Sequence, residues 1–157
     1  MLSETIPIEP LTIIHVRHQV SPLPIAKVTM TSNGSAQSVT LLLVEDDIPT
    51  QEFMKMALGK KYKIFTAVSA DEARSSLDAN AIDLVLMDLS LKGDEDGLQL
   101  TRTLRQSERF KRLPIIALTA HAYERDRENV FKAGCDAYFS KPFNRKDLIL
   151  EIEKLTE

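Results

Sequence analysis

Acidic, hydroxyl and lysine side chains stand directly after four short apolar runs of this sequence. They are, in chain order, Glu45, Asp46, Asp47, Asp88, Thr119 and Lys141. Clustered carboxylates repel one another, and a cluster of this type is tolerable chiefly when a divalent cation fills it. Oxygen ligands without His or Cys suit Mg²⁺ or Mn²⁺, and Mg²⁺ commonly joins a phosphate group. The pattern therefore favours chemistry on a phosphoryl group.

One carboxylate of such a site can act as a nucleophile. A metal between Asp46 and Asp88 would offset their charges and draw a phosphoryl group towards Asp88, which would hold it as an aspartyl phosphate. Lys141 offers a mobile positive charge and Thr119 a hydroxyl donor for the phosphoryl oxygens. Positioning and charge neutralisation would account for most of the catalysis.

Each of these residues also has a plainer interpretation. Glu45, Asp46 and Asp47 can begin a solvated helix, because acids are favoured at helix N-termini. Asp88 can cap the loop after its strand. The hydroxyl and the lysine can be ordinary loop residues. Because such residues occur together at the ends of four strands, we favour one shared chemical site over four independent structural roles.

The elements that must position these residues alternate between strand and helix. Strands are predicted at 39–44, 62–67, 83–87, 114–118 and 136–140. Helices are predicted from Pro49 to a stop at Gly59, from the capping box 69-SADE-72, and over 97–106, 122–133 and 144–155. Parallel neighbours require helical crossovers, so this order predicts an α/β fold: a doubly wound five-stranded parallel sheet with helices on both faces. Ligands of such sheets bind beyond the carboxyl ends of the strands.

The first 38 residues differ in composition from the rest of the chain. They hold four of the seven prolines and end in the linker-like stretch 31-TSNGSAQS-38. The runs 11–20 and 25–30 favour β-structure and could pair as a docked hairpin, whereas terminal position favours a poorly ordered extension. We expect an extension over residues 1–38 and one domain over residues 39–157.

The composition excludes several classes of protein. The 157 residues carry a formal net charge of -3, so no basic excess serves a dedicated nucleic-acid binder. The single Cys135 cannot form an internal disulfide. The apolar runs are far shorter than the ~20 residues that span a bilayer, and the acidic N-terminus lacks a secretory signal pattern. We expect a cytoplasmic protein without membrane insertion.

Residues 39–157 resemble the receiver domain of two-component response regulators. The resemblance rests on four ordered motifs: 41-LLLVEDD-47, 83-DLVLMDLSLKGDEDG-97, 115-IIALTAHA-122 and 133-AGCDAYFSKPF-143. It implies the flavodoxin-like fold of that family. It also implies a phosphoryl group accepted from a phosphohistidine on a sensor histidine kinase or histidine phosphotransfer protein, followed by slow hydrolysis. The term enzyme applies only loosely to this self-catalysed reaction.

The resemblance assigns the metal site residue by residue. It makes Asp88 the phosphoacceptor and Asp46 the direct Mg²⁺ ligand, with Glu45 contributing through water. Ser90 would give its backbone carbonyl to the metal. Asp47 matches a more variable acidic position of the family, and the resemblance gives it no firm role.

The resemblance also assigns a switch. Thr119 matches the family's switch hydroxyl, and Tyr138 the aromatic whose rotamer reports phosphorylation. Lys141 matches the family's lysine, and Pro142 would follow a cis peptide bond. Phosphorylation would then bias a pre-existing equilibrium between two conformations.

Competing interpretations fit less well. A flavodoxin-like electron carrier would need hydroxyls and amides for a flavin phosphate where 45-EDD-47 stands. A haloacid-dehalogenase-type phosphatase needs a second Asp where Ser90 stands, and a Rossmann dehydrogenase needs GxGxxG after the first strand. We expect a stand-alone receiver that signals to a downstream protein target, or by phosphorelay, without direct nucleic-acid contact; its oligomeric state is left open. The runner-up is a non-enzymatic adaptor that binds proteins regardless of phosphorylation.

Two residues beside the proposed chemistry suggest control of phosphoryl lifetime. The loop 91-LKGDEDG-97 lacks the proline common in the family and carries three extra acids. His121 lies where family side chains influence attack by water on the aspartyl phosphate, and our hypothesis is that Ser90 and His121 tune the lifetime of the phosphoryl group. We predict that His121→Ala changes the dephosphorylation rate of the phosphorylated chain; an unchanged rate would remove that role for His121.

Overall fold

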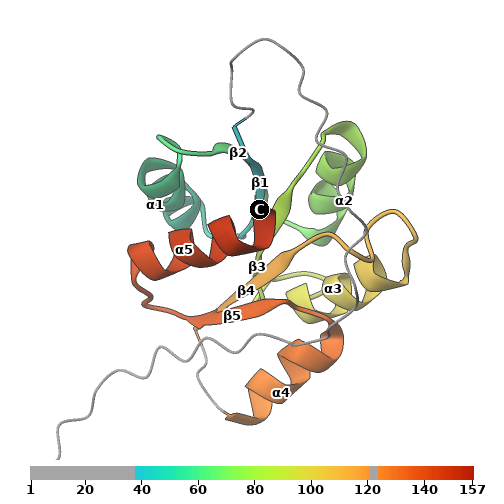
Figure 1. Cartoon of the computed structure of the whole chain (residues 1–157). Helices are drawn as coiled ribbons and strands as arrows, with labels where there is room; N and C mark the ends of the chain where they lie inside the picture. The colour runs from blue at the N-terminus through green and yellow to red at the C-terminus, as the bar shows by residue number, and fades with distance from the viewer. Residues whose placement is uncertain (1–37, 121–123) are drawn as a thin grey trace, which may run out of the picture.

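Five short parallel strands form the centre of the described part of the chain. The computed structural model describes residues 38–120 and 124–157. The strands are β1 (Thr40–Val44), β2 (Lys63–Ala67), β3 (Leu84–Asp88), β4 (Ile115–Thr119) and β5 (Ala137–Ser140). They lie in the order β2-β1-β3-β4-β5 (Figure 1). All five strand predictions are confirmed, and each observed strand starts one residue later than predicted.

Five helices join and follow these strands within the described residues. They are α1 (Ile48–Leu58), α2 (Ala70–Ala79), α3 (Gly97–Gln106), α4 (Glu124–Ala133) and α5 (Arg145–Thr156). The predicted doubly wound fold is thereby confirmed. The start of the predicted helix 122–133 and the extension up to residue 37 lie outside the described residues. None of the described helices is long and apolar enough to cross a membrane.

Caps fix where the helices begin and end. Gly59 follows α1 and its N–H bonds back to the carbonyl of Lys55, as expected for the end of this helix. The predicted capping box of α2 is only half right. Ser69 accepts from the N–H of Glu72 at 3.3 Å. However, the Glu72 carboxylate accepts from the N–H of Val68, one residue before the cap, because that donor lies within reach at 3.0 Å.

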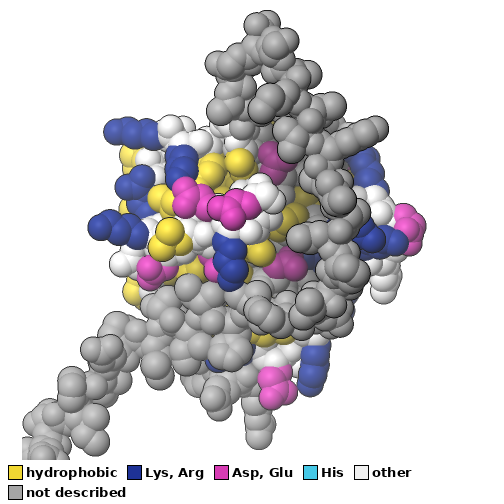
Figure 2. All heavy atoms as spheres, in the orientation of Figure 1, with side chains coloured by type: hydrophobic (Ala, Val, Ile, Leu, Met, Phe, Trp, Pro, Cys, Tyr) yellow, Lys and Arg dark blue, Asp and Glu magenta, His cyan; other side chains and the backbone are white. Residues whose placement is uncertain are grey.

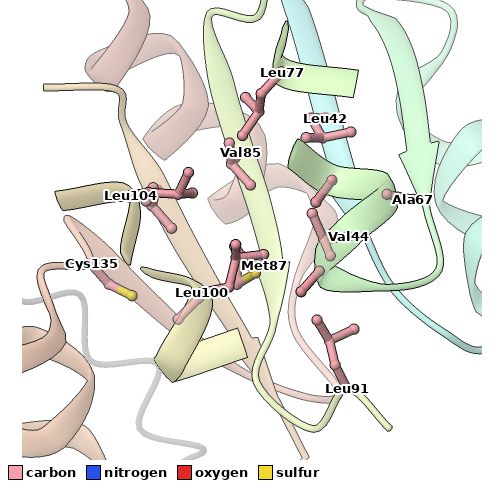
Figure 3. Packing of buried hydrophobic residues seen from close by; sticks show 14 of the residues in the cluster. Leu42, Val44, Ala67, Leu77, Val85, Met87, Leu91, Leu100, Leu104 and Cys135 are labelled. Atoms are coloured by element: carbon pink, nitrogen blue, oxygen red, sulfur yellow. The ribbon is translucent and has the colours of Figure 1, made fainter. Parts of the chain in front are cut away.

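Two apolar layers, one on each face of the sheet, hold the strands in place. On one face, Met54 and Leu58 of α1 pack with Leu148 and Ile152 of α5. On the other face, α2, α3 and α4 contribute a second cluster, and Figure 3 labels several of its residues, among them Leu77, Leu100 and Leu104. Every residue of β3 and β4 is buried. Each fully buried Leu stabilises the fold by about 1.5–3 kcal/mol relative to an exposed one.

The strand order places the expected chemistry at one edge of the sheet. β1 pairs with β2 on one side and with β3 on the other. The chain therefore moves to one side of β1 to form β2 and then crosses to the other side to form β3. Ligands of open α/β sheets bind beyond the carboxyl ends of the strands at such a reversal, which here lies between β1 and β3. The predicted acids Glu45 and Asp46 follow β1, and Asp88 is the last residue of β3.

A glycine lets α3 begin against the end of β3. A Cβ on Gly97 would lie 2.2 Å from the carbonyl oxygen of Asp88 and 2.9 Å from the Cα of Leu89. Both contacts are with backbone atoms, which cannot rotate away. The absence of a side chain therefore lets the first turn of α3 approach the backbone of Asp88.

We predict that Gly97→Ala lowers the free energy of unfolding by about 1–3 kcal/mol, because the added methyl group overpacks a backbone contact. Urea denaturation monitored by circular dichroism measures the change. Gln106→Ala, at an exposed position of the same helix, is the matched control and should leave stability nearly unchanged. Equal stability of the two variants would contradict the close packing.

Candidate metal and phosphoacceptor site

Three carboxylates meet at the carboxyl edge of the sheet. Glu45 and Asp46 follow β1, and Asp88 is the last residue of β3. One carboxylate oxygen from each of the three lies within 4.8 Å of the others, the grouping found in the described part of the chain. Glu45 and Asp88 are buried, with relative exposures of 2% and 4%. The structure thus brings together the three acids that the sequence analysis assigned to a metal.

A lysine that follows β5 contacts two of these acids. Lys141 follows β5, and its backbone N–H bonds to the carbonyl of Thr119 at 2.7 Å. Its Nζ lies 2.7 Å from Oε2 of Glu45 and 3.7 Å from Oδ2 of Asp88. The Lys141–Pro142 peptide bond is cis, as the resemblance implied. One ammonium group therefore contacts two of the three grouped carboxylates.

The surroundings of the buried Glu45 shift its pKa. Burial raises the pKa of Glu45 above its ordinary value, and the negative charge of Asp88 raises it further, while the hydrogen bond from Lys141 opposes both. Because the pKa of Glu45 is raised in the folded state, the folded chain binds more protons than the unfolded chain at pH values between the ordinary and the raised pKa. Stability from this group is therefore lost as pH rises through the raised pKa.

Backbone and amide donors orient the acids. The N–H of Ser90 donates to Oδ1 of Asp88 at 3.0 Å, and the N–H of Lys92 donates to Oδ2 of Asp46 at 3.3 Å. The buried Gln51 amide donates to the backbone carbonyl of Glu45 at 2.5 Å. The sequence analysis gave Gln51 and Lys92 no role. Gln51 is a polar residue on the buried stripe of α1, and this pattern could have predicted its role. The donor of Lys92 is its backbone N–H, which every residue except proline has, so the sequence could not predict it.

The third acid after β1 has a structural role. Asp47 is exposed, and its carboxylate caps α1 by accepting from the N–H and the hydroxyl of Thr50 at 2.9 and 2.6 Å. These hydrogen bonds lower the pKa of Asp47. The helix-start interpretation therefore describes Asp47, whose carboxylate is not part of the three-acid grouping.

The switch residues predicted from the resemblance lie on β4 and β5. Thr119 is the buried last residue of β4, in register with Ser140. Tyr138 is half-buried on β5 and packs against the apolar layer under α2, α3 and α4. Ser90 lies two residues after Asp88, and its side chain is exposed. His121 lies outside the described residues.

The donor set fits Mg²⁺. The acids offer oxygen ligands only, and Mg²⁺ is bound by one or two carboxylates together with waters and phosphate oxygens. A divalent cation at this position would offset the negative charge that the single Lys141 leaves uncompensated. Glu45, Asp46 and Asp88 are the residues that would hold it.

Comparison with known proteins shows the family. Residues 41–153 match the model of the response regulator receiver domain, so the chain belongs to this family. The response regulator Rre1 of Synechocystis is 35% identical over 115 residues, covering 72% of this chain and 49% of Rre1. The transcriptional regulatory protein ResD of Bacillus subtilis is 37% identical over 117 residues, covering 73% of this chain and 47% of ResD. The chain thus spans about half the length of these relatives.

Solved structures agree with this assignment. A response regulator structure from Chloroflexus aurantiacus has a TM-score of 0.72 and 32% identity, covering 76% of this chain and 98% of that one. The receiver domain of the sensor histidine kinase PA1611 from Pseudomonas aeruginosa has a TM-score of 0.69 and 35% identity, with the same coverage. In that structure a magnesium ion is coordinated in the active-site cleft.

We predict that Asp88→Asn stabilises the metal-free chain by about 1 kcal/mol at neutral pH, because it removes repulsion from the two neighbouring carboxylates. The asparagine keeps an oxygen for the N–H of Ser90, and Lys141 keeps Glu45 as its partner. Urea denaturation in the presence of a chelator measures the change. The exposed Glu128→Gln is the control and should alter stability by less than about 0.5 kcal/mol. A clear loss of stability in Asp88→Asn would contradict the repulsion.

Proposed function

We propose that this receiver domain accepts a phosphoryl group from a phosphohistidine donor onto Asp88, with Mg²⁺ bound beside it. The observation that carries the proposal is the meeting of Glu45, Asp46 and Asp88 within 4.8 Å, with Lys141 facing two of them. A carboxylate between a cation site and an ammonium group is placed to attack phosphorus, because both neighbours attract the phosphoryl oxygens.

The two oxygens of Asp88 have different surroundings. Oδ1 accepts the N–H of Ser90 at 3.0 Å, which fixes the plane of the carboxylate. Oδ2 lies 3.7 Å from Nζ of Lys141. In the proposed reaction a carboxylate oxygen bonds to phosphorus, the phosphorus–nitrogen bond of the donor breaks, and its electron pair stays on the imidazole. Lys141 would then hold a phosphoryl oxygen, and bound Mg²⁺ would neutralise the remaining charge.

The position of Thr119 supports a role as the switch. It ends β4, which is the neighbour of β3 in the sheet, and Asp88 and Leu118 are in register. A hydroxyl at this place would donate to a phosphoryl group on Asp88. Movement of the Thr119 side chain towards that phosphoryl group would leave space beside β5, into which the half-buried Tyr138 could turn. We propose that these two residues couple phosphorylation to a change of surface.

The charges on the surface of the domain suggest which kind of partner receives the signal. Several relatives are transcriptional regulators, and stand-alone action of this receiver stays a prediction. On the face shown in Figure 2, the described Lys and Arg side chains are interspersed with Asp and Glu side chains, and they form no continuous basic stripe there. Mixed charge of this kind suits a protein partner better than a phosphate backbone. We propose that the signal passes through protein contacts or onward in a phosphorelay.

We predict that the chain takes up one phosphoryl group from a small phosphodonor in the presence of Mg²⁺, and that Asp88→Asn takes up none. Phosphate-affinity gel mobility and intact-protein mass spectrometry measure the product. Asp94→Asn, at an exposed acid of the following loop, is the control and should be phosphorylated like the wild type.

Two outcomes would contradict the proposal. Equal labelling of wild type and Asp88→Asn would place the phosphoryl group elsewhere. A wild-type chain that takes up no phosphoryl group, while partner binding persists in Asp88→Asn, would favour the non-enzymatic adaptor.

A further inference from the structure

An ion pair holds the loop that follows the phosphoacceptor strand. Glu95 lies in the loop 89–96, between β3 and α3. Its carboxylate accepts two hydrogen bonds from Nη2 of Arg74 on α2, at 2.8 and 2.5 Å. It also accepts from the hydroxyl of Thr103 on α3 at 3.3 Å. The loop is therefore joined through one carboxylate to two helices.

The same loop contacts the acids of the site. Its Lys92 N–H donates to Oδ2 of Asp46, and its Ser90 N–H donates to Oδ1 of Asp88. Between these two donors, Leu91 is buried beside Val44 and Met87 in the apolar layer (Figure 3). The orientation of two of the three grouped carboxylates thus depends on the path of this loop.

The composition of the loop makes it costly to hold in one conformation. Residues 92–94 are exposed, and Gly93 has a φ of +126°, a conformation that only glycine adopts without strain. Fixing each backbone residue costs about 1–2 kcal/mol of conformational entropy. The loop has no proline to reduce that cost. Beyond Gly93, Glu95 anchors the loop through its side-chain contact with Arg74.

We propose that the Arg74–Glu95 pair is a positioning device for the metal site: it holds the loop so that the Lys92 amide keeps the Asp46 carboxylate turned towards Asp88. Arg74 and Glu95 would not touch the metal themselves, and their effect would pass through the loop backbone. The consequence for Mg²⁺ affinity rests on the proposed function, whereas the restraint of the loop does not.

The pair is partly exposed, with side-chain exposures of 35% for Arg74 and 22% for Glu95. Partly exposed ion pairs have modest effects. We therefore expect Arg74→Gln and Glu95→Gln each to weaken Mg²⁺ binding about two- to fivefold. In the metal-free chain, hydrogen exchange at the Lys92 amide should accelerate by a similar factor, because the loop leaves Asp46 more often.

The experiment combines isothermal titration calorimetry with Mg²⁺ and amide hydrogen exchange measured by NMR without metal. The charge-exchanged double variant R74E/E95R should restore part of both properties. Arg109→Gln is the matched control: it removes a 2.7 Å ion pair with Asp78 of α2, and the hydrogen bonds of Arg109 go to Leu77 and Asp78 of that helix. This control should leave both properties at wild-type values.

The two measurements separate two kinds of failure. If the wild type binds no Mg²⁺, the proposed function fails, while exchange at Lys92 still decides whether the pair restrains the loop. If the wild type binds Mg²⁺ and both single variants match it in affinity and in Lys92 exchange, the positioning role is overturned. Accelerated exchange with unchanged affinity would overturn the link to the metal site.

Discussion

The repulsion among three carboxylates at one edge of the sheet is the constraint on which the rest of the site depends. Two of the acids are buried, so water does little to screen them. Lys141 offsets part of the charge through its 2.7 Å contact with Glu45. The remaining negative charge would favour binding of a divalent cation beside Asp88. The fold stabilises an arrangement that would be unfavourable by itself, because its apolar layers fix the strand ends.

The scaffold therefore separates stability from chemistry. The apolar clusters lie between the sheet and its helices, and the acids lie beyond the strand ends. Gly97 and the loop 89–96 connect these regions, since the first touches the backbone of Asp88 and the second donates to Asp46 and Asp88. The proposed function requires such connections, because phosphorylation at the edge would have to alter surfaces elsewhere.

Much of the fold could be predicted from the sequence, because continuous apolar runs and helix caps are local signals. They placed all five strands to within a residue and set Glu45, Asp88 and Lys141 at the ends of β1, β3 and β5. The contacts that orient the site could not be predicted in this way. Arg74 and Glu95 are 21 positions apart and partly exposed, so no periodic pattern links them. The Lys92 amide is a backbone donor, and residue type gives no information about it. An aspartate can cap a helix or bind a metal, so the residue type alone could not show that Asp47 caps α1.

The central claim is that Glu45, Asp46 and Asp88 form one cation site. Paramagnetic Mn²⁺, added below equimolar amounts to isotopically labelled protein, tests it most directly, because the ion broadens the NMR signals of nearby amides. If the three acids form one cation site, the signals of the amides of residues 45–46 and 88–90 broaden first, and excess Mg²⁺ restores them. Broadening centred on exposed acids elsewhere, with these amides unaffected, would contradict it.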